Sequence, residues 1–325
     1  MKAVIDNKIP YIKGQIERLV DETVYLPGFG ISHADVVDAD ILIVRTRTKC
    51  NRELLEGTQV RLIVTATIGF DHIDTDYCEK AGIRWTNCPG CNANSVCIYV
   101  HNALVLTHRL NPSFTVGIVG VGHVGALVMH DLERCGMRVL LSDPPRHDKG
   151  DFVEGHEFTD LKQIQEEADI ITFHTPLNKD GKYSTYHIAD ASFFAGLKKK
   201  PLIINASRGG VVDNAALLDA INCHQVADAV VDTWENEPNI STELLKRVAI
   251  GTPHIAGYSA DGKANATRMS LRAVAEFLGI PFEPDIHIPE GEPLSPDTLQ
   301  RDSAALKDTP ERFEDFRSNY PIRRE

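Results

Sequence analysis

The sequence lacks any apolar run that approaches the ~20 residues a membrane span requires. It also lacks a basic surplus, because 34 Lys and Arg stand against 46 Asp and Glu, for a net charge of −12. Such a charge argues against nucleic acids and anionic membranes as partners. Charged residues are scattered through the first twenty positions, so we expect no secretory signal peptide. These absences together predict a globular protein of the cytoplasm.

The seven cysteines are an odd number in a long chain without a secretion signal, which favours reduced thiols over disulfides. Cys88-Pro-Gly-Cys91 has the spacing of a redox or zinc pair. However, no second CxxC or nearby Cys/His pair completes a tetrahedral site, and Pro-Gly is ordinary turn chemistry. We therefore predict no metal site and no redox role for this pair.

At 325 residues the chain is long enough for two domains. Short apolar runs alternate with helical patterns, which predicts two α/β domains of Rossmann or flavodoxin type, with parallel sheets covered by helices. The expected strands are 2–5, 40–45, 60–65 and 83–86, then 115–119, 139–143, 170–174, 202–205, 226–232 and 248–252. The expected helical segments are 9–19, 73–81, 95–107, the segment after Gly122, and 214–223 with Asp213 as its N-cap.

A glycine-rich string, GVGHVG from Gly120 to Gly125, follows an expected strand and opens an expected helix, as a dinucleotide fingerprint requires. Its glycines permit a tight turn, close approach of a pyrophosphate and packing of helix on strand. Asp143 ends the next strand, near the spacing of ~20 residues expected for a carboxylate that binds the ribose hydroxyls. We predict NAD as the cofactor. Arg146 keeps NADP as an alternative, and the fingerprint alone would also suit packing or S-adenosylmethionine.

Three strings in the second half each deliver one ionisable residue after an expected strand: NASRGG, WENEP and TPHIAG supply Arg208, Glu237 and His254. A guanidinium can bind a substrate carboxylate with a fork of donors, an imidazole can take a hydroxyl proton, and a carboxylate can hold the imidazole. Ligands of open parallel sheets bind beyond such strand ends, so we expect the three to share one crevice. The set predicts oxidation of a 2-hydroxy acid. Taken singly, each has an alternative as a surface ion pair, a solvated acid or a structural histidine.

These strings, together with ATIGFDHID at 66–74, SDPPR at 142–146 and FHTPL at 173–177, resemble the D-isomer-specific 2-hydroxyacid dehydrogenases. The resemblance covers residues 1 to about 280, and beyond them it rests mainly on FRSNYPIRRE. It implies that Arg208 binds the substrate carboxylate, His254 accepts the proton and Glu237 stabilises the charged imidazole.

The resemblance also implies further contacts. The NAD site would be lined by Gly120, Gly122, His123, Val124, Gly125, Asp143, Thr175, Ala206, Ser207, Arg208, Asp232 and Gly257. Thr46, Thr67 and Tyr258 would contact the substrate.

A phosphorylated substrate needs positive charge beyond Arg208. VRTRTK at 44–49 places Arg45, Arg47 and Lys49 at alternating positions, which would lie on one face of an extended chain. We interpret this run as a phosphate site, with Arg45 in contact with the substrate; a solvated basic loop is the alternative. The preferred substrate is a phosphorylated four-carbon 2-hydroxy acid. Other readings are a 2-oxo acid reductase of the glyoxylate or hydroxypyruvate type and a non-catalytic protein that senses NAD(H).

For the domains, we expect a discontinuous substrate domain of residues 1–94 and 258–280 and an NAD-binding domain of residues 95–257, with the active site between them. From residue 281 onward prolines and acids become frequent. We expect 281–325 to be a small C-terminal dimerisation segment, which makes the protein a homodimer.

Overall fold

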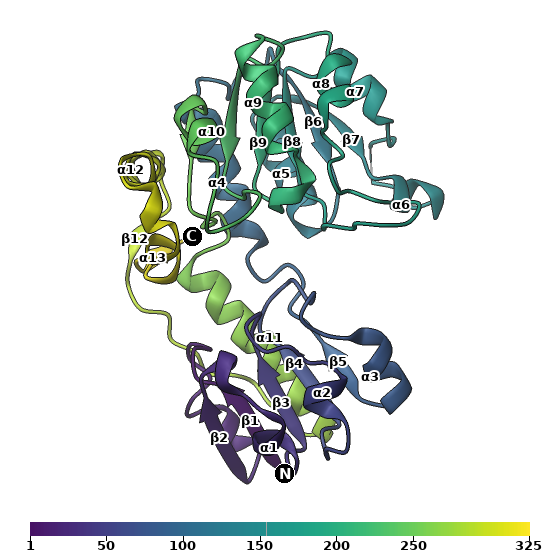
Figure 1. Cartoon of the computed structure of the whole chain (residues 1–325), viewed down its shortest axis with the longest axis vertical. Helices are drawn as coiled ribbons and strands as arrows, with labels where there is room; N and C mark the ends of the chain where they lie inside the picture. Colours follow the sequence, from purple (N-terminus) through teal and green to yellow (C-terminus); the bar gives the residue numbers. More distant parts are fainter. Residues whose placement is uncertain (154) are drawn as a thin grey trace. The chain divides into compact units, whose positions relative to one another are not determined.

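The computed structural model describes residues 1–153 and 155–325. The chain forms two compact units (Figure 1). Unit 1 comprises Met1–Asn92 and Ser259–Gly291, and unit 2 comprises Ala93–Tyr258 and Glu292–Glu325. None of the helices in the described ranges combines the length and the apolar character that a membrane crossing would need.

Unit 1 is built on a parallel sheet with the strand order β2-β1-β3-β4-β5. Its strands are β1 (Lys2–Asp6), β2 (Glu22–Leu26), β3 (Ile41–Val44), β4 (Leu62–Thr65) and β5 (Arg84–Thr86). Its helices are α1 (His33–Val36), α2 (Arg52–Leu55), α3 (Thr75–Ala81) and α11 (Ala260–Leu278), with 3₁₀ helices η1 (Ile16–Arg18) and η2 (Gly28–Gly30).

Alternate residues of the unit 1 strands enter two separate cores, as the two-residue period of a strand requires. In β1, Ala3 and Ile5 join the core under α11, whereas Val4 joins the core that Val36 and Leu55 complete on the opposite face. The sheet is therefore covered on both faces, which explains why its strands read as continuous apolar runs.

Unit 2 contains a six-stranded parallel sheet with the order β11-β10-β9-β8-β6-β7. Its strands are β6 (Thr115–Val119), β7 (Arg138–Ser142), β8 (Ile170–Phe173), β9 (Leu202–Asn205), β10 (Asp228–Val231) and β11 (Ile250–Gly251). The helices of this unit up to residue 258 are α4 (Ala93–Leu106), α5 (His123–Arg134), α6 (Pro144–Asp148), α7 (Leu161–Glu167), α8 (Ala191–Ala195), η3 (Gly209–Val211), α9 (Asn214–Asn222) and α10 (Thr242–Arg247).

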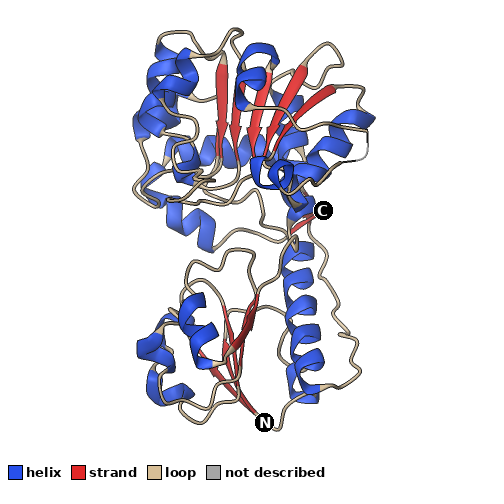
Figure 2. Cartoon of the chain, turned by 90° about the vertical axis from the view of Figure 1, so that its right-hand side faces the viewer, coloured by secondary structure: helices blue, strands red, loops and turns tan. Residues whose placement is uncertain are grey.

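Helices flank the strands of this sheet as well (Figure 2). One apolar core joins the sheet to α7, α8, α9 and α10, and the other joins its opposite face to α4 and α5. The helix ends follow the sequence signals. Asp213 caps α9 by accepting hydrogen bonds from the amides of Ala215 and Ala216, which confirms the predicted N-cap. Gly136, just past α5, has φ +77°, a conformation that suits glycine.

Two expectations for the first ninety residues are wrong in detail. Residues 9–19 form no α-helix; only the short η1 occurs there, and Pro10 and a left-handed Gly14 interrupt the periodic pattern. The strand β2, which pairs in parallel with β1, was not expected, because its residues are only partly buried and do not form an apolar run.

Residues 281–325 are divided between the two units at Gly291. The later part contains α12 (Pro296–Asp308), η4 (Pro310–Arg312) and α13 (Phe313–Ser318), and β12 (Glu292–Pro293) pairs with β13 (Arg323–Arg324). Leu306 and Phe313 are buried in the core of unit 2. The tail is thus part of the fold of this chain, and its expected role in dimerisation stays a prediction.

Candidate active site

The carboxyl ends of five neighbouring parallel strands in unit 2 carry the predicted site residues. Gly120 follows β6, Thr175 follows β8, Arg208 follows β9, and Asp232 and His254 follow β10 and β11. All strands of this sheet run in parallel, so these residues gather at one edge, and the strand order reverses between β6 and β8. A crevice at such a point is where open α/β sheets bind ligands.

His254 and Glu237 form a close pair at this edge. The Nδ1 atom of His254 lies 2.8 Å from Oε2 and 3.1 Å from Oε1 of Glu237. His254 has φ +57°, a strained conformation for a side chain of this kind, and its amide is held by the carbonyl of Asp232. With Nδ1 engaged by the carboxylate, Nε2 of the imidazole is the nitrogen left to exchange a proton.

Glu237 is ionised by its surroundings although it is mostly buried. Burial raises its pKa, but the hydrogen bond and charge of His254, the amide of Trp234 at 2.9 Å and the charge of Arg317 outweigh that effect, so the pKa lies below its ordinary value. A charged Glu237 orients the imidazole of His254 and stabilises its protonated form.

Arg317 of α13 brings the C-terminal tail to this pair. Its Nη1 atom lies 3.4 Å from Oε2 of Glu237, and its side chain is 28% exposed. Tyr320, three residues on, stands edge-to-face against Tyr258, with ring centroids 6.1 Å apart. The tail therefore contacts both a carboxylate expected to act in catalysis and a residue expected to contact the substrate. The sequence carried no signal for Arg317, because only folding brings it back to Glu237.

The loop that carries Arg208 packs directly on the loop that carries Glu237. A Cβ atom on Gly209 would lie 1.9 Å from the carbonyl oxygen of Trp234, so only glycine fits there. The Nδ2 atom of Asn205 donates to the carbonyl of Arg208 at 3.0 Å. Asn205 and Gly209 are positioning residues that the string NASRGG contains but that the sequence argument did not single out.

Asp232, expected in the NAD site, is buried beneath the His254 loop. Its carboxylate accepts hydrogen bonds from the hydroxyl of Thr252 at 2.7 Å and from the amides of Ile255 and Ala256 at 2.8 and 3.0 Å. Burial raises its pKa, which the nearby His254 and these hydrogen bonds partly offset. The hydroxyl of Tyr99 lies 2.7 Å from the hydroxyl of Thr252 and extends this hydrogen-bond network. Asp232 thereby fixes the backbone on either side of the His254 imidazole.

The glycine-rich turn has the geometry that a dinucleotide requires. Gly120 has φ +91°, and a Cβ on it would lie 2.7 Å from the carbonyl of His174. A Cβ on Gly125 would lie 2.0 Å from the carbonyl of Gly120, whereas one on Gly122 would meet nothing within 4 Å. The N-cap of α5 is Gly122, which has no side chain to cap the first amides of the helix. These N–H groups and the open space beside Gly122 fit a pyrophosphate.

A second observation at the same edge supports this fit. The hydroxyl oxygen of Thr175 is buried and has no hydrogen-bond partner among the described residues. A buried hydroxyl without a partner is costly, and a bound cofactor would satisfy it. His123 and Val124 begin α5 beside Gly122, with His123 exposed. The predicted contacts of these residues, and those of Ala206 and Gly257, stay predictions.

Asp143 and Arg146 are both engaged in the loop after β7. One carboxylate oxygen of Asp143 accepts from the amide of Val121 at 2.8 Å, and the other caps α6 through the amide of Arg146. The guanidinium of Arg146 is held by the carbonyl of Val121 at 2.7 Å and by Asp151 at 3.1 Å. Arg146 is therefore committed to the protein, which weakens the case for NADP.

Ser207, expected to line the NAD site, has its hydroxyl engaged within the protein. It is buried, and its hydroxyl donates to Oδ1 of Asn205 at 2.9 Å. It thus braces the turn before Arg208. The guanidinium of Arg208 donates to the carbonyl of Ser207 at 2.7 Å, which leaves its other donors for a substrate carboxylate.

Three of the expected substrate residues belong to unit 1. Thr67 shares a hydrogen bond with Thr65 at 2.7 Å and donates to Gly69 at 2.9 Å. Arg45 is half-buried and Thr46 exposed. Residues 45–49 form a turn, so the expected extended run with alternating faces is wrong: Thr48 is buried and donates to the carbonyl of Gly28. The guanidinium of Arg45 donates to the carbonyl of Lys8 at 3.3 Å.

The Cys88–Cys91 turn lies in unit 1. The thiol of Cys88 is buried against the carbonyls of Thr65 and Ala266, and burial raises its pKa to about 11. A thiol held protonated in this way is inert at neutral pH.

A family model described as "D-isomer specific 2-hydroxyacid dehydrogenase, NAD binding domain" matches residues 101–256. The chain is 52% identical to the erythronate-4-phosphate dehydrogenase of Bacteroides thetaiotaomicron over 342 residues, which cover all of this chain and 97% of that relative. It is 43% identical to the Escherichia coli protein of the same name, covering all of this chain and 92% of that relative.

Solved structures share the fold at lower identity. The D-lactate dehydrogenase from Aquifex aeolicus, complexed with NAD and lactic acid, matches 86% of this chain and 96% of that one, with a TM-score of 0.66 and 23% identity. An NAD⁺-bound 3-phosphoglycerate dehydrogenase in Entamoeba histolytica matches 88% of this chain and 99% of that one, with a TM-score of 0.70 and 22% identity. Sequence, site and fold agree that this chain belongs to the erythronate-4-phosphate dehydrogenase family, within the NAD-dependent D-isomer specific 2-hydroxyacid dehydrogenases.

Proposed function

We propose that the protein oxidises 4-phospho-D-erythronate at C2 with NAD, giving (R)-3-hydroxy-2-oxo-4-phosphonooxybutanoate for the synthesis of pyridoxal phosphate. The observation that carries this proposal is the His254–Glu237 pair at 2.8 Å, at the sheet edge that also bears Arg208 and the glycine-rich turn. The name shared by relatives that are 43–52% identical over the whole chain supports the choice of substrate.

The chain's residues divide the reaction between them. Arg208 binds the substrate carboxylate and draws electron density from the C2 oxygen. Nε2 of His254 accepts the hydroxyl proton, and the ionised Glu237 stabilises the resulting imidazolium; acid–base assistance of this kind contributes ~10²–10⁴-fold in rate. Bound NAD supplies the acceptor for the hydride that leaves C2. The products balance as the 2-oxo acid, NADH and one proton released through His254.

The distal phosphate needs a cation of its own, and we assign this role to Arg45. Lys263, on α11 of the same unit, supports the assignment: burial and, secondarily, the charge of Arg45 lower its pKa, so two cationic groups lie near one another. Two neighbouring cations repel each other, and an anion between them relieves that repulsion. The cluster is consistent with binding of a phosphate.

A substrate panel tests the proposal. NADH formation is measured with 4-phospho-D-erythronate, with D-erythronate and with other unphosphorylated 2-hydroxy acids, and glyoxylate and hydroxypyruvate are offered with NADH. We expect efficient turnover of the phosphorylated acid alone. Equal turnover without the phosphate would contradict the assignment, and preferential reduction of glyoxylate or hydroxypyruvate would favour the reductase reading. If the parent protein turned over none of these substrates, the result would favour a non-catalytic protein that senses NAD(H).

Variants locate the phosphate subsite. Arg45→Ala should raise KM for the phosphorylated acid while leaving the slow turnover of D-erythronate unchanged. Lys49→Ala is the matched control, because Lys49 is an exposed cation of the same turn. If both variants behave alike, the basic turn contributes only general attraction for anions.

We further propose that the protein acts in the cytoplasm as a homodimer. The structure describes all seven cysteines and pairs none of them in a disulfide, which suits a reducing compartment. Measurement of the molar mass in solution by light scattering tests the dimer, and a monomer that retains full activity would contradict it.

A further inference from the structure

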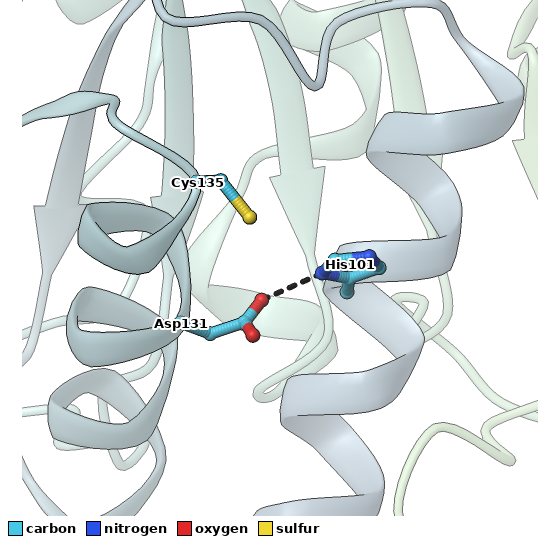
Figure 3. Close-up of side chains that lie close together, drawn as sticks. All are labelled: His101, Asp131 and Cys135. Atoms are coloured by element: carbon cyan, nitrogen blue, oxygen red, sulfur yellow. Dashed lines mark hydrogen bonds and ion pairs between the residues drawn. The ribbon is translucent and has the colours of Figure 1, made fainter.

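Two helices of unit 2 bring together three side chains that no part of the dehydrogenase reaction uses (Figure 3). His101 lies on α4, and Asp131 and Cys135 lie on α5 and at its end. Nδ1 of His101 and Oδ2 of Asp131 are 2.7 Å apart. One nitrogen, one oxygen and one sulfur atom of these residues all lie within 4.8 Å of one another.

The spacing of the cluster repeats on both helices. Cys97 precedes His101 by four residues on α4, and Asp131 precedes Cys135 by four residues across the last turn of α5. Residues four apart share one face of a helix, so each helix offers two ligand-type side chains to the other. Cys97 also lines a cavity of about 470 Å³ that Leu127 and Arg134 border. Metal sites in helical proteins are built from such facing pairs.

We propose that His101, Asp131 and Cys135 bind a zinc-class divalent cation, with Cys97 or a water from the adjoining cavity as the fourth ligand. Zinc takes nitrogen, sulfur and carboxylate oxygen in tetrahedral sites. A thiolate and a carboxylate neutralise the two charges of the cation. The sulfur ligand disfavours magnesium and calcium, which prefer oxygen.

The present geometry is close to what such an ion needs. Two tetrahedral ligands, each ~2.0 Å from zinc, stand ~3.3 Å apart. The His101–Asp131 contact at 2.7 Å would therefore open by roughly half an ångström on binding, which a rotation of side chains at a half-buried surface can supply. Within the described ranges, neither Cys97 nor Cys135 uses its thiol in a hydrogen bond, so neither has a partner to give up.

A second cluster shows what a site closed by its own bonds looks like. His187 faces Glu235 through Nε2 at 2.6 Å and Asp213 through Nδ1 at 3.5 Å. Glu235 also accepts from the amide of Asn214, and Asp213 caps α9. Both ring nitrogens of His187 face a carboxylate, and both carboxylates also hold backbone amides, so this cluster acts as a clamp between loops.

Arg134 is the group that opposes a cation at the first cluster. Its Nη2 atom lies 3.0 Å from Oδ1 of Asp131, and its side chain is 79% exposed. An exposed ion pair of this kind is worth little. Removing the positive charge should therefore strengthen cation binding without damaging the fold, which gives the proposal a variant that gains rather than loses affinity.

The test uses the full chain, reduced and freed of metal by a chelator. Co²⁺ is added, and the thiolate-to-cobalt absorption band reports a sulfur ligand; Zn²⁺ then competes against a chromophoric chelator. We expect one ion per chain, with ~10–100-fold weaker binding in His101→Ala and Cys135→Ser. Arg134→Gln should bind several-fold more tightly. NADH formation by Cys135→Ser should equal that of the parent, which separates this site from the dehydrogenase function.

Cys223→Ser is the matched control, because Cys223 is an exposed thiol outside the cluster. Cys97→Ser identifies the fourth ligand: a comparable loss assigns it to Cys97, and unchanged binding assigns it to water. Absence of the sulfur band in the parent would overturn the proposal. So would a band of undiminished intensity in Cys135→Ser, or equal affinity in the parent and Arg134→Gln.

Discussion

At the scale of single residues, the chemistry concentrates on one imidazole and the groups that hold it. Glu237 binds Nδ1 of His254, and the amide of Trp234 and the guanidinium of Arg317 hold Glu237 in turn. Each of these groups favours the ionised carboxylate. The proton-accepting nitrogen is therefore set in place by contacts that involve no substrate.

Replacing the carboxylate with an amide separates charge from position. In Glu237→Gln the side chain keeps its size and one hydrogen bond to His254, but the imidazolium loses its counter-charge. We expect kcat to fall ~10²–10⁴-fold with little change in KM. Steady-state kinetics with the phosphorylated acid give the result, and a loss confined to KM would show that Glu237 acts in binding instead.

The same substitution reveals the pH dependence of stability. Because the folded pKa of Glu237 is depressed, its contribution to stability is complete above the unfolded value of ~4.3 and is lost as pH falls through the folded value. Between these two pH values, the melting temperature of the parent should fall more steeply on acidification than that of Glu237→Gln. Parallel curves from calorimetry would contradict this linkage.

Arg317 lies outside the His254–Glu237 pair but affects the pKa of its carboxylate. Arg317→Gln removes a cation that lowers the pKa of Glu237, so the acidic limb of the kcat/KM profile should move to higher pH. Arg317→Lys keeps the charge, so its kcat/KM profile should lie close to that of the parent. A pH-independent loss of activity in both variants would mean that Arg317 only supports the packing of α13.

At the scale of elements, the contact between two loops decides whether Arg208 and Glu237 stand together. Gly209→Ala would drive a methyl group into the carbonyl of Trp234. We expect a loss of ~1–3 kcal/mol in the free energy of unfolding, as for other overpacked sites, with a large drop in kcat. Denaturant melts and kinetics are measured beside those of Gly210→Ala, whose new methyl would meet the side chains of Tyr186 at 3.3 Å and Leu177 at 3.4 Å rather than a backbone carbonyl. Equal losses of stability and kcat in Gly209→Ala and Gly210→Ala would show that the contact of Gly209 with Trp234 imposes no special constraint.

The elements that the sequence predicted well are those whose burial leaves a pattern. Strands such as β3 and β9 are buried on both faces and appear as apolar runs. β2 was missed because a half-exposed edge strand forms no apolar run. The start of α12 is marked by Ser295 and Pro296, but the frequent prolines and acids around it favoured an irregular segment. The turn at 45–49 was misjudged for a related reason: the hydroxyl of Thr48 bonds to Gly28, a contact that spacing does not reveal.

At the scale of the whole molecule, the residues that we propose act on the substrate could be named from the sequence, and most of those that position them could not. Arg208, Glu237 and His254 each follow a strand end, so parallel topology alone gathers them. Tyr99 and Arg317 act through contacts between residues far apart in the chain. The Cys97–His101 and Asp131–Cys135 spacings were visible too, but only the packing of α4 on α5 makes them one cluster.

Through the ion pair between α13 and Glu237, the end of the chain affects how the activity of the enzyme depends on pH. Proteolytic removal of about the last dozen residues would remove Arg317 but leave the glycine-rich turn and the imidazole of His254 in place. Preparations clipped in this way would still turn over substrate, yet would work best in more alkaline buffer than intact material.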